Sequence, residues 1–456
     1  MSRTTPLLRM ASVVSITMIV VLVAWNGSTA RASVPRHAGS GPAAAGLSPA
    51  PADPFAAADK KYKGQTIVYY GGSVGTDHTA DVALSARFTK DTGIKISIHE
   101  QPSDSTAANA ELQRVFSSGS SSIDVSRIDV IWPGIFGQYL LDLKKPLSAL
   151  IPLEYASIIK NDTVGGHLVG MPYQGDFGML YYRKDLLKKY GYSAPPTTWT
   201  QLTAMAKKIQ AGEQKSNKSF SGFVFQGNSY EGLTCNALEW IASYGGGTII
   251  DSKGNVTLDN PKAKAALKLA QSWVGTISPK GVTTYAETDT ANAFTAGNAA
   301  FARNWPYMTA PTLIGTSKVA GKWAVSPLPH GPGGKSSATT GGWQIAVSKF
   351  TKHAGASEAW ARYYASKPVQ VWRAVNSAIV PTMPSVGSVA SVKKAMPFLT
   401  TVGNNTARVV RPSTVLKTKY NQGSTYFFQG VNQILNGQSV DSYVSSISSE
   451  LKNLHP

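Results

Sequence analysis

Cysteine is almost absent from this sequence of 456 residues: Cys235 is the single one, so no disulfide can form within the chain. The seven histidines form neither an H-E-x-x-H pair nor a cluster with the cysteine, and metal sites usually need such spacing. The glycine-rich phosphate loops of nucleotide-binding proteins are missing as well. We therefore expect no metal and no cofactor. Cys235 lies among apolar residues at helical spacing, which predicts a packed core position.

Charged residues make up only 15% of the chain, and acids are the scarcer kind: 25 Asp and Glu against 44 Lys and Arg, a formal net charge of +19. Such an excess is compatible with nucleic acid or another anionic surface. The basic residues lie in separate stretches such as "LLKKYG", "AMAKKIQ" and "PKAKAALK", without the interleaved aromatic residues of a nucleic-acid groove. We interpret them as solvated helix faces and expect no nucleic-acid partner.

The first 32 residues have the organisation of a secretory signal peptide. Arg3 and Arg9 precede a mostly apolar run from Met10 to Trp25, and Ala30-Arg31-Ala32 forms an A-x-A cleavage site. A retained membrane anchor is the alternative, but the run is shorter than the roughly 20 residues of a spanning helix. No cysteine accompanies the site, so we expect a periplasmic or secreted protein without a lipid anchor. Residues 33–59, rich in Ala, Pro, Gly and Ser, predict a flexible tether.

The remaining chain is long enough and apolar enough to predict two α/β lobes. Hydrophobic residues reach 42%, and a single core stops growing near roughly 250–300 residues. The strand-like runs "QTIVYY", "IKISIHE" and "RIDVIW" alternate with helical patterns over 79–90 and 106–117, which indicates βαβ units and a parallel sheet. A second series follows, with helices expected over 231–244 and 261–274. Ligands of such folds bind at the carboxyl ends of the strands.

The stretch "GGSVG" matches the G-x-S-x-G turn that carries the nucleophile of many hydrolases, which makes Ser73 a candidate. A nucleophile elbow needs earlier strands beside it, whereas "QTIVYY" is the first strand of the predicted fold. We therefore interpret the glycines as a tight turn that brings backbone N–H groups and a helix N-terminus to a ligand. Spacing alone leaves open a glycosidase with two facing carboxylates.

Acids and tryptophans stand at the ends of several predicted elements. Asp129 lies in "RIDVIWPGIF", Asp176 interrupts the apolar run "MPYQGDFGMLYYR", and Trp305 and Trp343 lie in "FARNWPYM" and "GGWQIAVS". Carbohydrates present C–H faces that stack on aromatic rings, and hydroxyls that carboxylates bind. Acids amid apolar strand residues are costly unless something pairs them. The pattern favours a carbohydrate site, although a polyamine would also use acids and aromatic rings.

Six segments in order resemble the solute-binding proteins of ABC sugar importers, specifically their trehalose/maltose-binding branch. They are "IDVIWPG", "MPYQGDFGMLYYRKDLLKKYGYSAPPTTW", "FQGNSYEGLTCNALEW", "FTAGNAAFARNWPY", "VSPLPHGPGGKSSATTGGW" and "VVRPS", and the resemblance spans Gln65 to about Asn436. It implies an α/β, two-lobe periplasmic-binding-protein fold of the Venus-flytrap kind, similar to type II, with a hinge and discontinuous lobes. The expected lobes are 60–172 plus 328–375, and 173–327 plus 376–456.

The resemblance also implies a function and a set of contacts. Such a protein is a monomeric receptor, not an enzyme, that captures a disaccharide such as a trehalose-like or maltose-like α-glucoside and delivers it to an importer's permease. Carried over by position, the ligand-binding residues are Asp77, Asp129, Asp176, Glu231, Trp305, Gly342, Trp343 and Arg411. Each has a structural alternative: helix capping for Asp77 and Glu231, core packing for the tryptophans, and pairing with an acid for Arg411.

Overall fold

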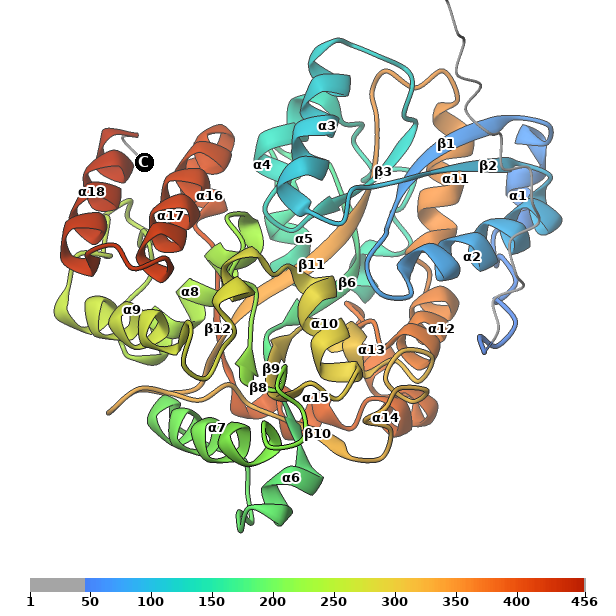
Figure 1. Ribbon diagram of the computed structural model, residues 1–456. Helices are drawn as coiled ribbons and strands as arrows, with labels where there is room; N and C mark the ends of the chain where they lie inside the picture. Colours follow the sequence, from blue (N-terminus) through green and yellow to red (C-terminus); the bar gives the residue numbers. More distant parts are fainter. Residues whose placement is uncertain (1–45, 455–456) are drawn as a thin grey trace, which may run out of the picture. The chain divides into compact units, whose positions relative to one another are not determined.

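A computed structural model describes residues 46–454 of the chain (Figure 1). The signal peptide predicted for residues 1–32, and the first part of the tether predicted for 33–59, lie outside the described residues. Within the described part, no helix combines the length and the apolar character that crossing a membrane requires.

The first sheet is built from βα units at the start of the fold. Its strands β1 (Thr66–Gly71), β2 (Lys95–Glu100) and β3 (Val125–Asp129) run parallel, in the order β3-β1-β2. They are connected by α2 (Asp77–Thr92) and α3 (Ser105–Ser117), as the alternation of strand and helix patterns predicts. The helix α3 begins after Asp104, whose carboxylate accepts hydrogen bonds from two backbone N–H groups of the first turn.

Three further strands extend this sheet, and one of them connects it to the second sheet. The strand β11 (Ser337–Val347) pairs antiparallel with β3 and β6 (Met171–Phe177), and parallel with β12 (Ala407–Val409). Only Gly178 separates β6 from β7 (Met179–Arg183), the first strand of the second sheet. The chain therefore passes directly from one sheet into the other at this point.

The second sheet has the order β10-β7-β9-β8, with β8 (Ser221–Val224), β9 (Ala299–Asn304) and β10 (Trp323–Ser326). Aromatic rings from this sheet and its covering helices pack together: the ring centroid of Trp273 lies 5.4 Å from those of Phe223 and Trp199, and 5.7 Å from that of Trp240. Helices in this part are α6 (Lys184–Lys189), α7 (Trp199–Glu213), α8 (Glu231–Ser243), α9 (Pro261–Trp273) and α10 (Glu287–Thr295).

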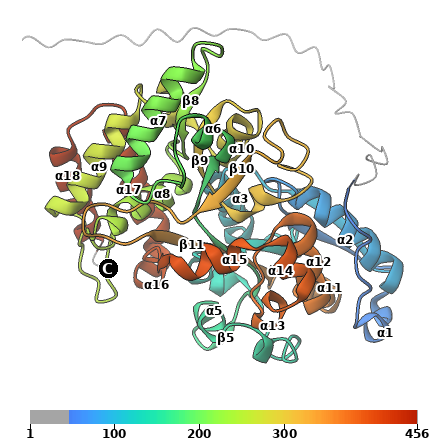
Figure 2. The same cartoon turned by 90° about the horizontal axis from the view of Figure 1, so that it is seen from below.

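The C-terminal helices α17 (Tyr420–Leu435) and α18 (Val440–Asn453) lie beside α8 and α9 in both ribbon views (Figures 1 and 2). The first sheet is covered by α11 (Ala354–Tyr364) and α12 (Lys367–Ser377), which pack against α2. Shorter elements complete the described chain: α1 (Ala56–Asp59), α4 (Pro133–Phe136), α5 (Ala156–Asn161), β4 (Thr163–Val164), β5 (His167–Leu168), α13 (Pro384–Gly387), α14 (Ala390–Ala395), α15 (Phe398–Thr401) and α16 (Ser413–Leu416).

The segment 46–59 differs from the flexible tether predicted for residues 33–59. Its backbone accepts hydrogen bonds from the indole N–H of Trp372 at Ser48 and from the hydroxyl of Tyr363 at Pro51. Asp59 is buried and pairs with the guanidinium of Arg362. The composition of the segment carries no hydrophobic period, so nothing local indicates this packing. Side chains from helices some 300 residues away hold the segment in place.

Candidate ligand-binding site

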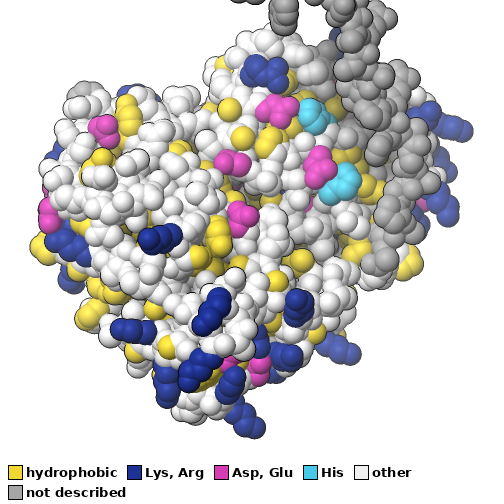
Figure 3. All heavy atoms as spheres, viewed as in Figure 1, with side chains coloured by type: hydrophobic (Ala, Val, Ile, Leu, Met, Phe, Trp, Pro, Cys, Tyr) yellow, Lys and Arg dark blue, Asp and Glu magenta, His cyan; other side chains and the backbone are white. Residues whose placement is uncertain are grey.

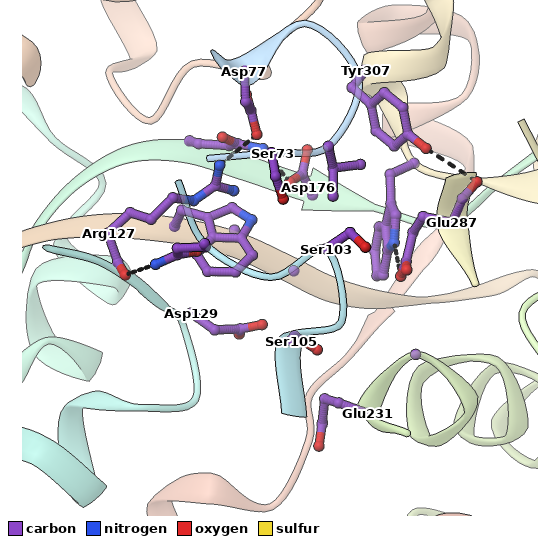
Figure 4. A pocket seen from close by; sticks show the side chains of 18 of the residues that line it. Ser73, Asp77, Ser103, Ser105, Arg127, Asp129, Asp176, Glu231, Glu287 and Tyr307 are labelled. Atoms are coloured by element: carbon purple, nitrogen blue, oxygen red, sulfur yellow. Dashed lines mark hydrogen bonds and ion pairs between the residues drawn. The ribbon is translucent and has the colours of Figure 1, made fainter. Parts of the chain in front are cut away.

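A cavity of about 80 Å³, partly open to solvent, is lined by residues of the first sheet and by residues of helices and loops from distant parts of the chain (Figure 4). All eight residues singled out in the sequence line it: Asp77, Asp129, Asp176, Glu231, Trp305, Gly342, Trp343 and Arg411. The structure therefore brings together side chains that are widely separated along the chain. Their hydrogen bonds within the protein decide which of them remain available to a ligand.

Asp77 lies at the first position of α2, but its carboxylate does not cap that helix. Thr76 occupies the N-cap position, and no side chain makes a capping hydrogen bond there. The Asp77 carboxylate instead accepts hydrogen bonds from Arg127, and from Arg373 at 3.0 Å. Both guanidinium groups are buried, so Asp77 is held as part of an ion-pair network.

Arg127 also covers one face of Trp343. Its guanidinium lies 3.8 Å from the indole centroid, a cation–π arrangement. Trp343 is held opposite Asp129 on β3 and opposite Gln174 on β6, because β11 pairs with both strands at this position. One face of the indole is therefore already in contact with protein before a ligand arrives.

Asp176 has the most distinctive carboxylate of the cavity. Its Oδ2 accepts a hydrogen bond from the Gln174 amide at 2.8 Å, while its Oδ1 is buried and finds no partner among the described residues. Burial raises the pKa of Asp176 from 3.8 to about 7, and the hydrogen bond from Gln174 opposes that shift. An unpartnered buried acceptor is costly, so this oxygen is suited to a ligand donor.

Arg411 connects acids from two parts of the fold. Its guanidinium donates to Asp129 at 2.8 Å and to Glu231, the first residue of α8, at 3.0 Å. Glu231 also accepts from the hydroxyls of Tyr420 and Ser424, each at 2.6 Å, which leaves it fully engaged. Burial raises the pKa of Glu231, and Arg411 opposes that rise. The alternative expected for Arg411, pairing with an acid, is therefore what the structure shows.

Trp305 follows β9 and is anchored on its indole N–H. That group donates to Glu287 at 3.2 Å, and the guanidinium of Arg303 stacks on the indole at 3.9 Å from the ring centroid. The other oxygen of Glu287 accepts from the hydroxyl of Tyr230. Burial raises the pKa of Glu287. Trp305 is partly buried and lines the cavity, so part of its indole packs in the protein and part faces the cavity.

Gly342 is required by the strand crossing itself. Its φ is +141°, and the first side-chain carbon of any other residue would lie 2.4 Å from the carbonyl oxygen of Gln174, which would strain the backbone. Its carbonyl already accepts a hydrogen bond from the Val130 N–H at 3.0 Å. A ligand that bonds to the Gly342 carbonyl would therefore share this oxygen with the Val130 N–H.

Several lining residues were not singled out from the sequence as contacts. They are Ser73, Val74, Gln101, Pro102, Ser103, Ser105, Arg127, Gln174, Gly232, Cys235, Glu287, Tyr307 and Gly341. Glu287 opens a helix without any motif around it, and Arg127 looks like an ordinary strand residue. Buried cations and acids that pair across the fold leave no local signal in a sequence.

The cavity is poorly equipped for covalent chemistry. Ser73 lines it on the loop between β1 and α2, but no histidine stands among the lining residues to act as its base. Cys235 lines it too, and burial raises the pKa of its thiol, which keeps it protonated and unreactive. Across residues 46–454, no group of three or more His, Cys, Asp or Glu side chains is arranged to hold a metal ion.

The charges that line the cavity are largely balanced within the protein. Asp77 faces two arginines, and one arginine serves both Asp129 and Glu231. Behind Trp305, Arg303 forms a buried pair with Glu239. Such pairs leave a polar, hydrogen-bonding surface next to indole rings, while Asp176 and Glu287, which also line the cavity, form no ion pair among the described residues. That combination suits an uncharged ligand with many hydroxyl groups better than an ion.

Comparison with known proteins places this chain in a family. The sequence model of the bacterial extracellular solute-binding proteins matches residues 71–371. A probable ABC transporter-binding protein of Deinococcus radiodurans is 45% identical over 387 residues, which cover 84% of this chain and 92% of that protein. The structure of maltose-bound MalE3 of T. maritima matches with a TM-score of 0.80 and 34% sequence identity. The match covers 85% of this chain and 99% of the MalE3 chain. The GacH receptor of Streptomyces glaucescens shares the fold, with a TM-score of 0.75 and 22% sequence identity. That match covers 86% of this chain and 98% of the GacH chain.

The chain belongs to the bacterial extracellular solute-binding protein family. It has the two-lobe α/β fold of these receptors, which confirms the fold class predicted from the sequence. It is a solute-binding receptor of an ABC transporter rather than an enzyme, so the glycosidase considered from its acids is set aside.

Proposed function

We propose that the cavity binds a disaccharide of the α-glucoside class, such as trehalose or maltose, for delivery to the permease of an ABC importer. The similarity to MalE3, whose structure contains maltose, supports this assignment, since 34% identity extends over 85% of the chain. A maltodextrin-binding protein of Bacillus subtilis is 28% identical over 210 residues, which cover 45% of this chain and 47% of that protein.

The observation that carries the proposal is the unpartnered oxygen of Asp176. Its Oδ1 is buried and accepts no hydrogen bond from the described residues, and Asp176 lines the cavity. A sugar hydroxyl donates the hydrogen bond that this oxygen lacks. The nearby indole of Trp305 offers a surface on which the C–H face of a pyranose ring can stack.

A polyamine receptor is disfavoured by the same charges. The carboxylates of Asp77, Asp129 and Glu231 each accept a hydrogen bond from an arginine, so of the lining acids Asp176 and Glu287 alone remain without a cation for a di- or tricationic ligand. Binding of a polyamine should weaken strongly as salt rises, whereas binding of a neutral sugar should change little.

Closure of two lobes on the sugar is the mechanism that fits these contacts. We take the lobes as residues 60–172 plus 328–375, and residues 173–327 plus 376–456. Asp129 and Trp343 belong to strands of the first sheet, while Trp305 follows a strand of the second. A ligand shifts the equilibrium between open and closed forms only through contacts that differ between them, and contacts from both lobes meet that condition. We expect the receptor to act outside the cytoplasm, as a monomer.

Isothermal titration calorimetry of the chain from Ser33 onwards tests the assignment directly. The ligands are trehalose, maltose, sucrose, glucose and spermidine, each at low and high salt, with the recovered ligand analysed for hydrolysis. Tight, salt-insensitive binding of an intact α-glucoside is the expected result. Binding of spermidine alone, or silence toward every sugar, would overturn the proposal.

A further inference from the structure

No lysine lines the ligand-binding cavity, and the structure gathers many of the lysines on one face. Residues 184–218 and 318–322 contain nine lysines and two acids, a formal charge of +7. We call this region the lysine face. It appears as a concentration of dark blue side chains in the lower part of Figure 3, over the α6 and α7 region of Figure 1.

Contacts between elements bring these separate stretches together. Lys189 and Tyr190, at the end of α6, both bond to Glu213 at the end of α7, and Lys208 donates to the Tyr190 carbonyl at 2.9 Å. The loop 318–322 leads into β10, which pairs with β7 directly before α6. In the sequence these lysines resemble solvated faces of separate helices, because only the tertiary structure makes the helices adjoin.

The lysine face lacks the acids that neutralise other lysines of this protein. On α9, Lys264 pairs with Asp259 and Lys268 pairs with Asp441. On the lysine face one acid, Asp185, is already bound by the buried Arg183, and Glu213 is shared by Lys189 and a tyrosine. By contrast, residues 66–136 of the first sheet carry five basic and eight acidic residues, a formal charge of −3. The lysine face is therefore more positive than the part of the chain that holds β1, β2 and β3.

We propose that the lysine face docks on a membrane surface rich in anionic phospholipid headgroups. All nine cations are lysines, whose point charges on flexible stems suit a diffuse anionic surface, whereas an acidic or phosphorylated protein is more often met by planar, bidentate arginines. Docking holds the receptor beside the membrane in which its permease lies, and orients it through this uneven charge. Docking of this kind does not depend on which solute the cavity binds.

The test is flotation of the chain from Ser33 onwards with vesicles of phosphatidylcholine alone or mixed with phosphatidylglycerol. Binding is expected only to the mixed vesicles and should fall steeply as salt rises. The face variant carries Lys→Gln at 184, 188, 207 and 218, positions that form no ion pair among the described residues. The control variant carries Lys→Gln at 60, 90, 95 and 352, exposed positions elsewhere that remove the same charge.

Each lysine near an anionic lipid surface multiplies the partition constant by up to roughly fivefold, so loss of four should weaken binding by at least about tenfold and by up to several hundredfold. The control variant should keep most of its binding. Circular dichroism and sugar titration, expected to be unchanged, show that both variants are folded. Absence of binding to mixed vesicles at low salt, or equal loss in both variants, would overturn the proposal. Binding to soluble polyphosphate without binding to vesicles would overturn it too, and would assign the face to an anionic polymer instead.

Discussion

Replacing Asp176 with Asn should stabilise the free protein and weaken sugar binding. The carboxylate is 8% exposed, and burial raises its pKa to about 7 from an ordinary value of 3.8. The native state therefore holds its proton more firmly than the unfolded state does. Because of this, Asp176 costs the fold nothing below pH 3.8, and its full penalty applies once the pH has risen through about 7.

The size of that penalty follows from the same pKa values. Each pKa unit corresponds to about 1.4 kcal/mol, so ionised Asp176 costs the native state at most about 4 kcal/mol above neutral pH. An Asn side chain keeps an oxygen to accept from Gln174 and carries no charge. We expect the variant to gain about 1–4 kcal/mol in free energy of unfolding near pH 8, and almost nothing near pH 4.

Sugar affinity should move in the opposite direction. A hydroxyl that donates to a carboxylate forms a bond worth about 1.5–3 kcal/mol, whereas the variant, whose one oxygen accepts from Gln174, presents an amide N–H₂ instead of an acceptor at the Oδ1 position. The variant should therefore bind the sugar about tenfold more weakly near pH 8. In the unaltered protein, affinity should fall up to about tenfold as pH drops from about 8 to about 6, because protonation of Asp176 competes with binding. The variant should show no such pH dependence.

Urea unfolding at the two pH values, with calorimetric titration of the sugar, measures both effects. Asp441→Asn is the control, since that carboxylate is exposed and pairs with Lys268 on the surface, where solvent screening leaves little effect on stability. A loss of stability in Asp176→Asn near pH 8 would refute the penalty assigned to this carboxylate. An equal gain in stability at both pH values would refute it as well.

The paired residues of the cavity should respond in other ways. Asp77→Asn should lower the free energy of unfolding by about 3–5 kcal/mol, since it leaves buried Arg127 without a carboxylate and Arg373 with Asp81 alone. Thermal unfolding measures this loss, and a neutral effect would contradict the network. Arg411→Met should remove the cation beside Asp129 and Glu231 and raise the pKa of Glu231 further, so its stability should fall as pH rises, and restoration at low pH is the decisive observation. Trp305→Ala should weaken sugar binding by about 1–2 kcal/mol in calorimetry while Trp305→Phe keeps most of the affinity, and equal losses would argue against stacking.

The elements of the fold could be predicted from local pattern, because strands and helices leave a period in the sequence. The helix expected over 231–244 is observed at Glu231–Ser243, and the helix expected over 261–274 at Pro261–Trp273. The segment 46–59 could not be predicted in this way. It is held by hydrogen bonds from Tyr363 and Trp372 to its backbone, and backbone acceptors have no signature in composition.

Some cavity residues could also be identified from local sequence pattern, and others could not. Asp129, Asp176 and the two tryptophans were identified because polar or aromatic residues at the ends of strands are conspicuous, and all of them line the cavity. The arginines that neutralise the acids were mostly missed. Arg127 and Arg373 lie far from each other in the sequence and meet only at Asp77, so their role depends on tertiary contacts.

The packing of segment 46–59 has a practical consequence for recombinant forms of the receptor. A domain boundary drawn where the first strand begins would remove Asp59 from its arginine, and would uncover Trp372, which is now 6% exposed. Such a truncated chain would present fresh apolar surface at α12 and should aggregate more readily than a chain that begins before Ser48. A fusion partner, affinity tag or fluorescent reporter is therefore best attached ahead of this segment.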